Sequence, residues 1–307
     1  MERRKSKQIM VGDVPIGGGA PVVIQSMTNT PTSDADATIA QIKALAAAGC
    51  QIARCTVPDD ASAAALTEIL AKSPLPVIAD IHFDYKMALA AIEAGVHGLR
   101  LNPGNIGGAE KVRMVADAAK AKNIPIRVGV NTGSLEKELL KKYGGITADA
   151  MVESAIKQVH ILEAQGFDQI KISLKASNVP FMLEAYRKLA AVTDYPFHIG
   201  VTEAGTAKRG SIKSSVGIGA LLAEGIGDTI RVSLAADPVE EIFVAKEILR
   251  SLGLYEKGAE FIVCPTCGRT KIPVAEIAEE VEALVDKMDI PKKIKIAVMG
   301  CVVNGPG

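Results

Sequence analysis

The sequence predicts an α/β protein in which eight parallel strands close into a barrel with the helices outside it. Short apolar runs rich in β-branched residues recur eight times between residues 21 and 252, and each is followed by a stretch of helical pattern. An open, doubly wound sheet is the alternative, but the even spacing of eight units favours closure. No GxGxxG fingerprint follows the first strand, so a dinucleotide-binding fold is not indicated.

The first unit illustrates how each element is predicted. The run PVVIQSM at 21–27 predicts a strand, and the following TSDADATIAQIKALAAAG predicts a helix that Ser33 or Asp34 caps and Gly49 ends. The remaining strands are predicted at 51–57, 75–83, 97–103, 124–131, 169–176, 196–204 and 228–236.

A small αβ module is predicted after the barrel. The eighth helix, at about 238–252, leads into the polar connector SLGLYEKGAE. FIVCPTCG then predicts a strand entering a loop, PVAEIAEEVEALVDKM an amphipathic helix, and KKIKIAVMGCVV a last strand. We assign 1–255 to a substrate-binding barrel and 256–307 to the module, which we expect to be incomplete because its last strand leads into NGPG, where the sequence ends.

The composition limits the possible functions. Of the 307 residues 48% are hydrophobic, which allows a large buried core. Lys plus Arg and Asp plus Glu each number 35, and this balance argues against a broad nucleic-acid surface, which needs surplus positive charge. No apolar run is long enough to span a membrane, so we expect no membrane association.

The first residues, MERRKSKQIMVGDVPIGGG, are basic but lack the apolar segment of a signal peptide. We therefore expect the protein in the cytoplasm, with Arg3, Arg4 and Lys5 in a solvated tail. Five cysteines in a reducing compartment argue against structural disulfides and for metal binding or catalysis.

Charged and amide side chains gather where the predicted strands end. In TIM-type barrels the chemistry lies at the carboxyl ends of the strands, because these ends meet on one face of the barrel. The residues of this kind are Arg54, Asp80, His82, Arg100, Asn102, Arg127, Asn131, Lys175, Glu203, Arg231 and Ser233.

Several of the arginines lie among apolar neighbours, in LRLN, IRVG and IRVS. Because side chains alternate along a strand, Arg100 and Asn102 share one face, as do Arg231 and Ser233. If that face is the barrel interior, guanidinium groups converge there and repel one another unless an anion or a carboxylate lies between them. Guanidinium groups pair bidentately with phosphate and keep their charge. The sequence therefore predicts a multiply charged anionic substrate, such as a phosphate ester or a diphosphate.

Some of these residues have two interpretations. Asp80 and Glu203 are either ion-pair partners of the arginines or proton donors and acceptors near the leaving oxygen. Lys175 either binds the anion or forms a Schiff base, as in some barrel aldolases. Of the two histidines near strand ends we choose His82 as the catalytic candidate, and we expect His198 to be a core residue.

The stretch VCPTCG contains a CxxC pair, Cys264 and Cys267, of the kind found in redox dithiols, zinc sites and iron–sulfur sites. A third cysteine, Cys301, follows on another predicted strand, and a dithiol mechanism does not need it. The module has no histidine, so zinc would need a carboxylate or an outside ligand beside three thiolates. Three cysteines suit a catalytic [4Fe–4S] cluster with one open iron. Cys50 and Cys55 are predicted to be small buried core residues.

Nine motifs in order carry a resemblance to a known family: PVVIQSMTNTPT, ADIHFDYK, LRLNPGNIG, GVNTGSLEK, ISLKAS, GVTEAG, GIGDTIRVSLAADPVEEI, CPTCGR and GCVVNGPG. The resemblance runs from about Met10 to Gly307. The sequence resembles the bacterial-type 4-hydroxy-3-methylbut-2-enyl diphosphate synthases, reductive iron–sulfur enzymes near the end of the methylerythritol phosphate route to isoprenoids.

The resemblance implies an oxidoreductase that opens 2-C-methyl-D-erythritol 2,4-cyclodiphosphate and removes a hydroxyl group with two electrons from flavodoxin or ferredoxin. It also implies a homodimer in which the module of one chain covers the barrel of the other. By the same resemblance Asp80, His82 and Glu203 handle protons, and Cys264, Cys267 and Cys301 bind a [4Fe–4S] cluster. The implied substrate-binding residues are Arg54, Arg100, Asn102, Arg127, Asn131, Lys175, Arg231, Ser233 and Asn304.

One departure from the family affects the cluster. In the family a glutamate that serves as the fourth iron ligand follows NGPG, whereas this sequence ends at Gly307. We therefore expect a protein of this length to hold a labile cluster and to have little or no activity. Two alternative functions remain. One is a barrel aldolase or lyase acting on a phosphorylated substrate, with a structural zinc tail, and the other is a non-enzymatic phosphate-binding or scaffold protein.

Overall fold

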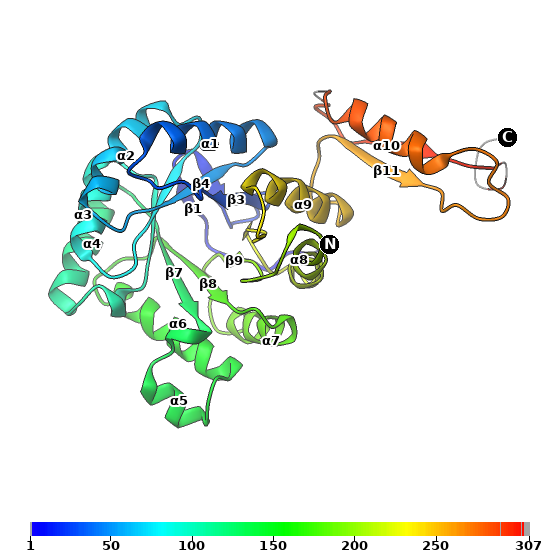
Figure 1. Cartoon of the computed structure of the whole chain (residues 1–307). Coiled ribbons are helices and arrows are strands. Elements are labelled where there is room, and N and C mark those ends of the chain that lie inside the picture. The colour runs from blue at the N-terminus through cyan, green and yellow to red at the C-terminus, as the bar shows by residue number, and fades with distance from the viewer. Residues whose placement is uncertain (1, 289, 302, 304–307) are drawn as a thin grey trace. The chain divides into compact units, whose positions relative to one another are not determined.

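The structure is a computed structural model that describes residues 2–288, 290–301 and 303 (Figure 1). The chain divides into two compact units, Met1–Ile248 and Leu249–Gly307.

The first unit is a barrel of eight parallel strands, as the sequence predicts. The order of hydrogen-bonded neighbours is β8-β7-β6-β5-β4-β3-β10-β9. A parallel bridge between Ile172 and Phe197 joins the two ends of this order, and Ile172 N donates to Pro196 O at 3.0 Å. The strands are β3 (Val23–Met27), β4 (Ile52–Thr56), β5 (Val77–Asp80), β6 (Gly98–Leu101), β7 (Ile126–Asn131), β8 (Ile170–Lys175), β9 (His198–Ile199) and β10 (Thr229–Ile230).

The seventh and eighth strands are much shorter than the predicted 196–204 and 228–236, because β9 and β10 have two residues each. Beyond them the two segments converge: a Cβ atom on Gly200 would lie 2.4 Å from the carbonyl oxygen of Arg231. Only glycine permits this approach of backbone to backbone. The predicted ends of these strands are therefore loops that line the mouth of the barrel.

Helices surround the strands, as Figure 1 shows. In α1, Asp34 is the predicted cap, since its side chain accepts a hydrogen bond from Ala37 N, and Gly49 ends the helix in the left-handed conformation. The short helix α5 and two 3₁₀ turns, η1 and η2, are additions to the predicted pattern. The elements are α1 (Ala35–Ala48), α2 (Asp60–Lys72), α3 (Tyr85–Ala94), η1 (Pro103–Asn105), α4 (Ala109–Ala121), η2 (Thr132–Ser134), α5 (Lys137–Tyr143), α6 (Ala148–Glu163), α7 (Val179–Ala190), α8 (Ala207–Ala223) and α9 (Pro238–Ser251).

Alternation along each strand divides the buried residues between two sides of the barrel wall. On β4, Ala53 and Cys55 pack outward against Ile39 and Ile42 of α1. Cys50 and Cys55 are both buried, as predicted. Arg54, which lies between the two outward residues of β4, faces the barrel interior instead. The same alternation carries the other polar strand residues inward.

A hairpin of β1 (Ile9–Val11) and β2 (Val14–Ile16) closes the barrel at the amino-terminal ends of its strands. Ile9, Val11 and Ile16 form one apolar cluster with Val23, Ile52 and Ile78, which begin or lie within β3, β4 and β5. The sequence analysis did not predict this hairpin. It makes the far end of the barrel apolar and leaves the carboxyl ends of the strands as the polar face.

The prediction that Arg3 and Arg4 lie in a solvated tail is wrong. Arg3 Nη2 lies 3.3 Å from a carboxylate oxygen of Asp228, and the Arg4 guanidinium lies 3.9 Å over the ring of Phe197. Because the hairpin caps the barrel, the residues before it run along the barrel rim and meet these partners. Lys5 is exposed, as predicted.

The second unit is a βαβ module of β11 (Ala259–Val263), α10 (Val274–Val285) and β12 (Ile294–Val298). The two strands are parallel, with Ala259 opposite Ile294 and Val263 opposite Val298. Val274 and Ala278 of α10 are buried. The strand, helix and strand agree with the predicted order of elements.

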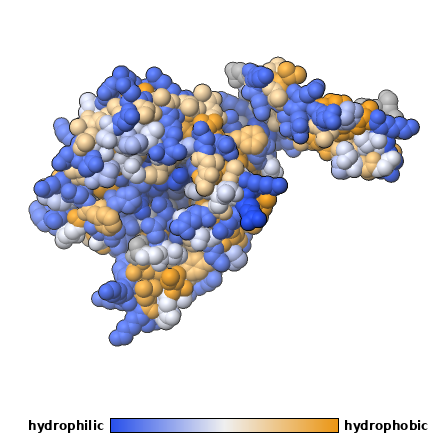
Figure 2. Space-filling view, in the orientation of Figure 1, coloured by the Kyte–Doolittle hydropathy of each residue, from blue (hydrophilic) through white to orange (hydrophobic). Residues whose placement is uncertain are grey.

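The surface mixes hydrophilic and hydrophobic residues over the face seen in Figure 2. Among the described residues, none of the helices has both the length and the apolar character needed to cross a membrane.

Candidate active site

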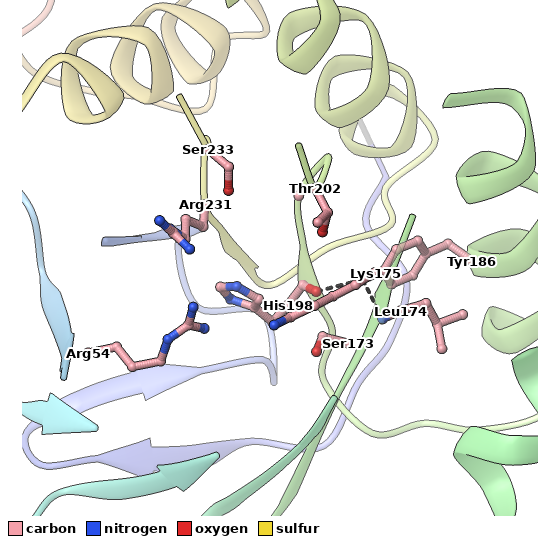
Figure 3. Close-up of a pocket in the computed structure, with 10 residues that line it drawn as sticks. Arg54, Ser173, Leu174, Lys175, Tyr186, His198, Thr202, Arg231 and Ser233 are labelled. Carbon is pink, nitrogen blue, oxygen red and sulfur yellow. Dashed lines mark hydrogen bonds between the residues drawn. The ribbon is translucent and has the colours of Figure 1, made fainter. Parts of the chain in front are cut away.

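A polar hollow of about 410 Å³, counted with the solvent space at its mouth, lies at the carboxyl ends of the barrel strands. Figure 3 shows Arg54 and Arg231 directed toward the same space as Lys175 and His198. Four residues predicted from the sequence as substrate ligands, Arg54, Lys175, Arg231 and Ser233, thus line one hollow. Its lining is Arg54, Ser173, Leu174, Lys175, Tyr186, His198, Gly200, Thr202, Arg231 and Ser233.

Asp80, at the end of β5, pairs with two of the arginines. Its carboxylate lies 3.4 Å from Arg54 Nε and 3.2 Å from Arg100 Nη1, and all three side chains are almost fully buried. Burial alone would raise the pKa of Asp80, but Arg54, Arg100 and Arg127 outweigh it and lower the pKa to about 2. Asp80 therefore remains ionised near neutral pH and cannot supply a proton there.

Arg100 is held in place by the neighbouring strand β7. Its Nη2 donates to Gly129 O at 3.2 Å, while Gly129 N donates to Asn102 Oδ1 at 2.9 Å. A Cβ atom on residue 129 would lie 3.0 Å from Arg100 Nε, so glycine leaves the room that the guanidinium group needs. Arg100 and Asn102 share the inward face, as the alternation predicts, and both are buried.

Arg127 and Lys175 lie on β7 and β8. Nη1 of Arg127 donates to Ser173 Oγ, which lines the hollow. Asn131, at the end of β7, is in register with Lys175 at the end of β8. Burial, followed by the charges of Arg127 and Arg54, lowers the pKa of Lys175 to about 6. The lysine is therefore largely neutral at pH 7 in the ligand-free protein.

Glu241, near the start of α9, is a site residue that the sequence analysis missed. Its carboxylate accepts hydrogen bonds from Ser26 Oγ at 2.9 Å and from Leu234 N at 3.1 Å, and it also pairs with Arg231. The side chain is 3% exposed. The signal was present in the sequence, because Glu241 precedes the buried Ala245 by four residues and so lies on the apolar stripe of the helix.

His198 is also part of the site and was expected only in the core. It is buried, its Nδ1 lies 2.7 Å from Thr229 Oγ1, and its ring lines the hollow. Tyr186 Oη donates to the His198 carbonyl at 2.6 Å and accepts from Leu174 N at 2.9 Å, the two interactions drawn in Figure 3. Burial, reinforced by Arg127 and Lys171, lowers the pKa of His198 well below its usual value. The ring is therefore neutral.

The other two residues predicted to handle protons lie at the exposed rim. His82 follows β5, its side chain is exposed, and partial burial together with Arg100 and Lys175 lowers its pKa. Glu203 follows β9 in the left-handed region at φ 54° and is exposed. Neither residue lines the hollow in this structure.

Positive charge exceeds negative charge in this part of the barrel. Among the described residues, six basic side chains converge on the interior or its mouth, against two carboxylates, Asp80 and Glu241, and even with Lys175 neutral the four arginines outnumber these carboxylates. Such a surplus of buried cations is unfavourable unless an anion joins them. The cations are Arg54, Arg100, Arg127, Lys171, Lys175 and Arg231.

The predicted cluster ligands lie in the second unit. Cys264 directly follows β11, and its backbone N–H donates to Val298 O at the end of β12 at 2.9 Å. Since β11 and β12 are parallel, Cys264 and Cys301 leave the sheet at the same end. Cys267 is exposed in the loop after β11. In the part of the chain that the structure describes, no three His, Cys, Asp or Glu side chains are close enough to hold a metal ion. Asn304 lies outside the described residues.

Solved structures with the same architecture come from several enzyme classes. An N-acetylneuraminic acid synthetase from Leptospira borgpetersenii has a TM-score of 0.56 at 14% identity, covering 91% of this chain and 96% of that one. A truncated 3-deoxy-D-arabino-heptulosonate 7-phosphate synthase from Thermotoga maritima has a TM-score of 0.55 at 13% identity, covering 81% and 91%. At these identities the likeness shows the fold alone.

Sequence comparisons are more specific. A relative from Geobacter sulfurreducens is 61% identical over 305 residues, covering 99% of this chain and 86% of the relative. One from Clostridium tetani is 58% identical over 307 residues, covering 100% and 87%. Both are named 4-hydroxy-3-methylbut-2-en-1-yl diphosphate synthase (flavodoxin). The GcpE TIM-barrel domain matches residues 6–246, and the GcpE protein C-terminal domain matches residues 260–307. Because these matches span nearly all of the sequence, the chain belongs to the GcpE family.

Proposed function

We propose that the chain catalyses the reductive ring opening and dehydroxylation of 2-C-methyl-D-erythritol 2,4-cyclodiphosphate to 4-hydroxy-3-methylbut-2-enyl diphosphate, in isoprenoid precursor biosynthesis. The family membership supports this reaction. The observation that carries it is the surplus of buried cationic side chains at the carboxyl end of the barrel. A cyclic diphosphate provides the negative charge that this surplus requires.

The proposed substrate ligands divide by position. Arg54, Lys175, Arg231 and Ser233 line the hollow and would contact the diphosphate directly. Asp80 stays ionised and orients Arg54 and Arg100, so its proposed role is to position cations rather than to transfer protons. Further ligands in the proposal are Arg100, Asn102, Arg127, Asn131 and Asn304.

The residues proposed to gain or lose protons during the reaction are Lys175, His82 and Glu203. Lys175, with a pKa of about 6, takes up a proton when the anionic substrate raises that pKa, and so gives the diphosphate another positive partner. His82 and Glu203, exposed at the rim, would exchange protons between solvent and the leaving hydroxyl group.

The proposed cofactor is a [4Fe–4S] cluster in the second unit. Three thiolates that leave one end of the β11–β12 sheet, from Cys264, Cys267 and Cys301, are the donor chemistry that such clusters use. When bound, the cluster would supply the two electrons of the reaction, one at a time, from flavodoxin or ferredoxin. The proposal accordingly divides the chain into a substrate-binding barrel, 1–255, and a cluster module, 256–307. A homodimer and a cytoplasmic location belong to the same proposal.

The test is an anaerobic assay of the purified, iron-reconstituted protein with the cyclodiphosphate and reduced flavodoxin, with iron and sulfide analysis and EPR alongside. The assay is run on this chain and on one extended past Gly307, and formation of the hydroxylated alkenyl diphosphate by the extended protein, lost in its Arg231→Met variant, is the expected result. A zinc-binding protein that forms an imine at Lys175, trapped by borohydride, would instead identify a barrel aldolase or lyase. Tight binding of the cyclodiphosphate without turnover by iron-loaded protein would identify a binding protein.

A further inference from the structure

A second, smaller cavity lies inside the barrel, beneath the substrate hollow. Ile9 and Val11 of the capping hairpin line one side of it, and residues at or beside the starts of β5 to β8 line the other. Two cationic side chains, Arg127 and Lys171, contribute the polar part of its wall. They are in register on the adjacent strands β7 and β8, so both point into the same space. Neither residue is exposed by more than 2%.

These two cations have donors that nothing in the described structure accepts. Lys171 Nζ, Arg127 Nε and Arg127 Nη2 are buried without a hydrogen-bond partner among the described residues. Buried polar groups are nearly always paired, and an unpaired buried charge costs several kcal/mol. The remaining side chains of the lining are apolar, and no carboxylate is among the described residues that form it.

The nearest acids are already engaged elsewhere. Asp80 pairs with Arg54 and Arg100 at the top of the barrel. Asp228 accepts hydrogen bonds from Arg3 and from Phe197 N at the lower rim. The pKa values of Arg127 and Lys171 are both lowered, first by burial and then by neighbouring positive charge. An arginine does not lose its proton in a protein, so Arg127 stays charged, and a negative partner in the cavity would also keep Lys171 protonated.

The size of the cavity limits what that partner can be. It has room for about one water-sized particle, which excludes phosphate, sulfate and carboxylate ligands. A monatomic anion is the smallest negative partner and the one that comes nearest to this size, and two convergent N–H donors among apolar side chains suit a weakly hydrated one. We propose that this cavity is a second anion site, which binds one chloride ion between Lys171 and Arg127. The proposal does not depend on the reaction proposed above.

The site has a consequence for the substrate hollow above it. Arg127 also donates to Ser173 Oγ, which lines that hollow. An anion below would therefore orient Arg127 under the substrate and keep Lys171 protonated. Because chloride binds the folded state, it stabilises that state by an amount that rises with the logarithm of one plus the ratio of its concentration to the dissociation constant.

The experiment uses bromide as the probe and a matched pair of variants. Lys171 and Lys175 lie on the same strand and face the same interior, one at the lower cavity and the other at the substrate hollow. Wild type, Lys171→Met and Lys175→Met are crystallised in sodium bromide, and diffraction is measured at the bromine absorption edge. In parallel, Tm is measured in sodium bromide and in sodium gluconate at equal ionic strength.

We expect an anomalous peak between Lys171 and Arg127 in the wild type and in Lys175→Met, and none in Lys171→Met. Bromide should raise the Tm of the same two proteins, and Lys171→Met should weaken this halide effect about tenfold or more in concentration. A water molecule without anomalous signal at the wild-type cavity would overturn the proposal, and this readout does not require any variant to fold. If the halide effect is lost in Lys175→Met and kept in Lys171→Met, the halide binds in the substrate hollow. That result would also overturn the proposed site in the lower cavity.

Discussion

The carboxylate of Glu241 faces the guanidinium group of Arg231 with two parallel contacts, Nε to Oε2 and Nη2 to Oε1, both 3.4 Å long. This pair connects the first turn of α9 to the loop after β10. The bidentate arrangement orients the guanidinium plane, and Figure 3 shows that plane at the mouth of the hollow. Glu241 is therefore a positioning residue for Arg231.

Glu241→Gln should weaken binding of the cyclodiphosphate about tenfold, because hydrogen bonds to a charged partner contribute about 1.5–3 kcal/mol. The expected kinetic pattern is a raised KM with a smaller change in kcat, measured beside calorimetric binding. Glu240→Gln is the control, since the Glu240 side chain is exposed on the same helical turn. Unchanged or tighter binding in Glu241→Gln would mean that the carboxylate only neutralises Arg231 and does not position it.

Asp80→Asn should destabilise the fold by about 3–5 kcal/mol, because it leaves Arg54 and Arg100 buried without their shared carboxylate. Denaturant unfolding measures this loss, with Asp168→Asn as a control at an exposed position. The pKa of Asp80 is lowered to about 2 in the folded state, below the unfolded value of about 3.9. Its stabilisation is therefore present above about pH 4 and is lost as the pH falls toward 2.

The Asp80→Asn variant also tests the direction of this pH dependence of stability. Wild type should lose stability more steeply than Asp80→Asn between about pH 4 and pH 2. Parallel acid-unfolding curves for the two proteins would contradict the assigned pKa.

Substrate binding should be accompanied by proton uptake at Lys175. Its pKa of about 6 in the free protein leaves it mostly neutral at pH 7.5, and a bound diphosphate raises that pKa. Affinity should therefore decrease as the pH rises above about 6. Calorimetry in two buffers of different ionisation enthalpy measures the uptake, which Lys175→Met should reduce. Equal uptake by the variant and the wild type would assign the proton to another group.

Three single variants, in which serine replaces Cys264, Cys267 or Cys301, should each have a lower iron and sulfide content after reconstitution and lack the EPR signal of the cluster. Cys55→Ala is the control, because Cys55 is fully buried in the barrel wall and burial raises the pKa of its thiol to about 11. Such a thiol stays protonated and does not bind metal. A full iron content in any of the three serine variants would remove that residue from the ligand set.

Much of the fold follows from local patterns. Alternating apolar runs and amphipathic stretches predict the eight strands and the helices between them, and the βαβ order of the module follows from the same periods. The hairpin at 9–16 was missed because its strands have only three residues each, too few to show a period. They are strands because Ile9, Val11 and Ile16 find an apolar barrel end to cover.

The candidate site also contains residues that the sequence predicts and residues that it does not. Arg54, Lys175 and Arg231 could be predicted because the ends of parallel strands meet on one face of a barrel, whatever the details of packing. The sequence pattern alone does not assign Glu241 and His198 to the site, because a glutamate on the apolar stripe of a helix and a histidine in a short strand both have ordinary structural explanations. Their roles depend on Ser26 and Thr229, which come from strands distant in the sequence.

The sequence by itself determined the barrel, the rim of cationic residues and the family, because each depends on residue types at short, regular spacings. Only the tertiary structure decided how those charges are paired. Asp80 forms ion pairs with Arg54 and Arg100, and Glu241 with Arg231, while Arg127 and Lys171 share a cavity with no carboxylate in its described wall. Pairing depends on distances between strands that are far apart in the chain, and on burial, which makes each unpaired charge costly.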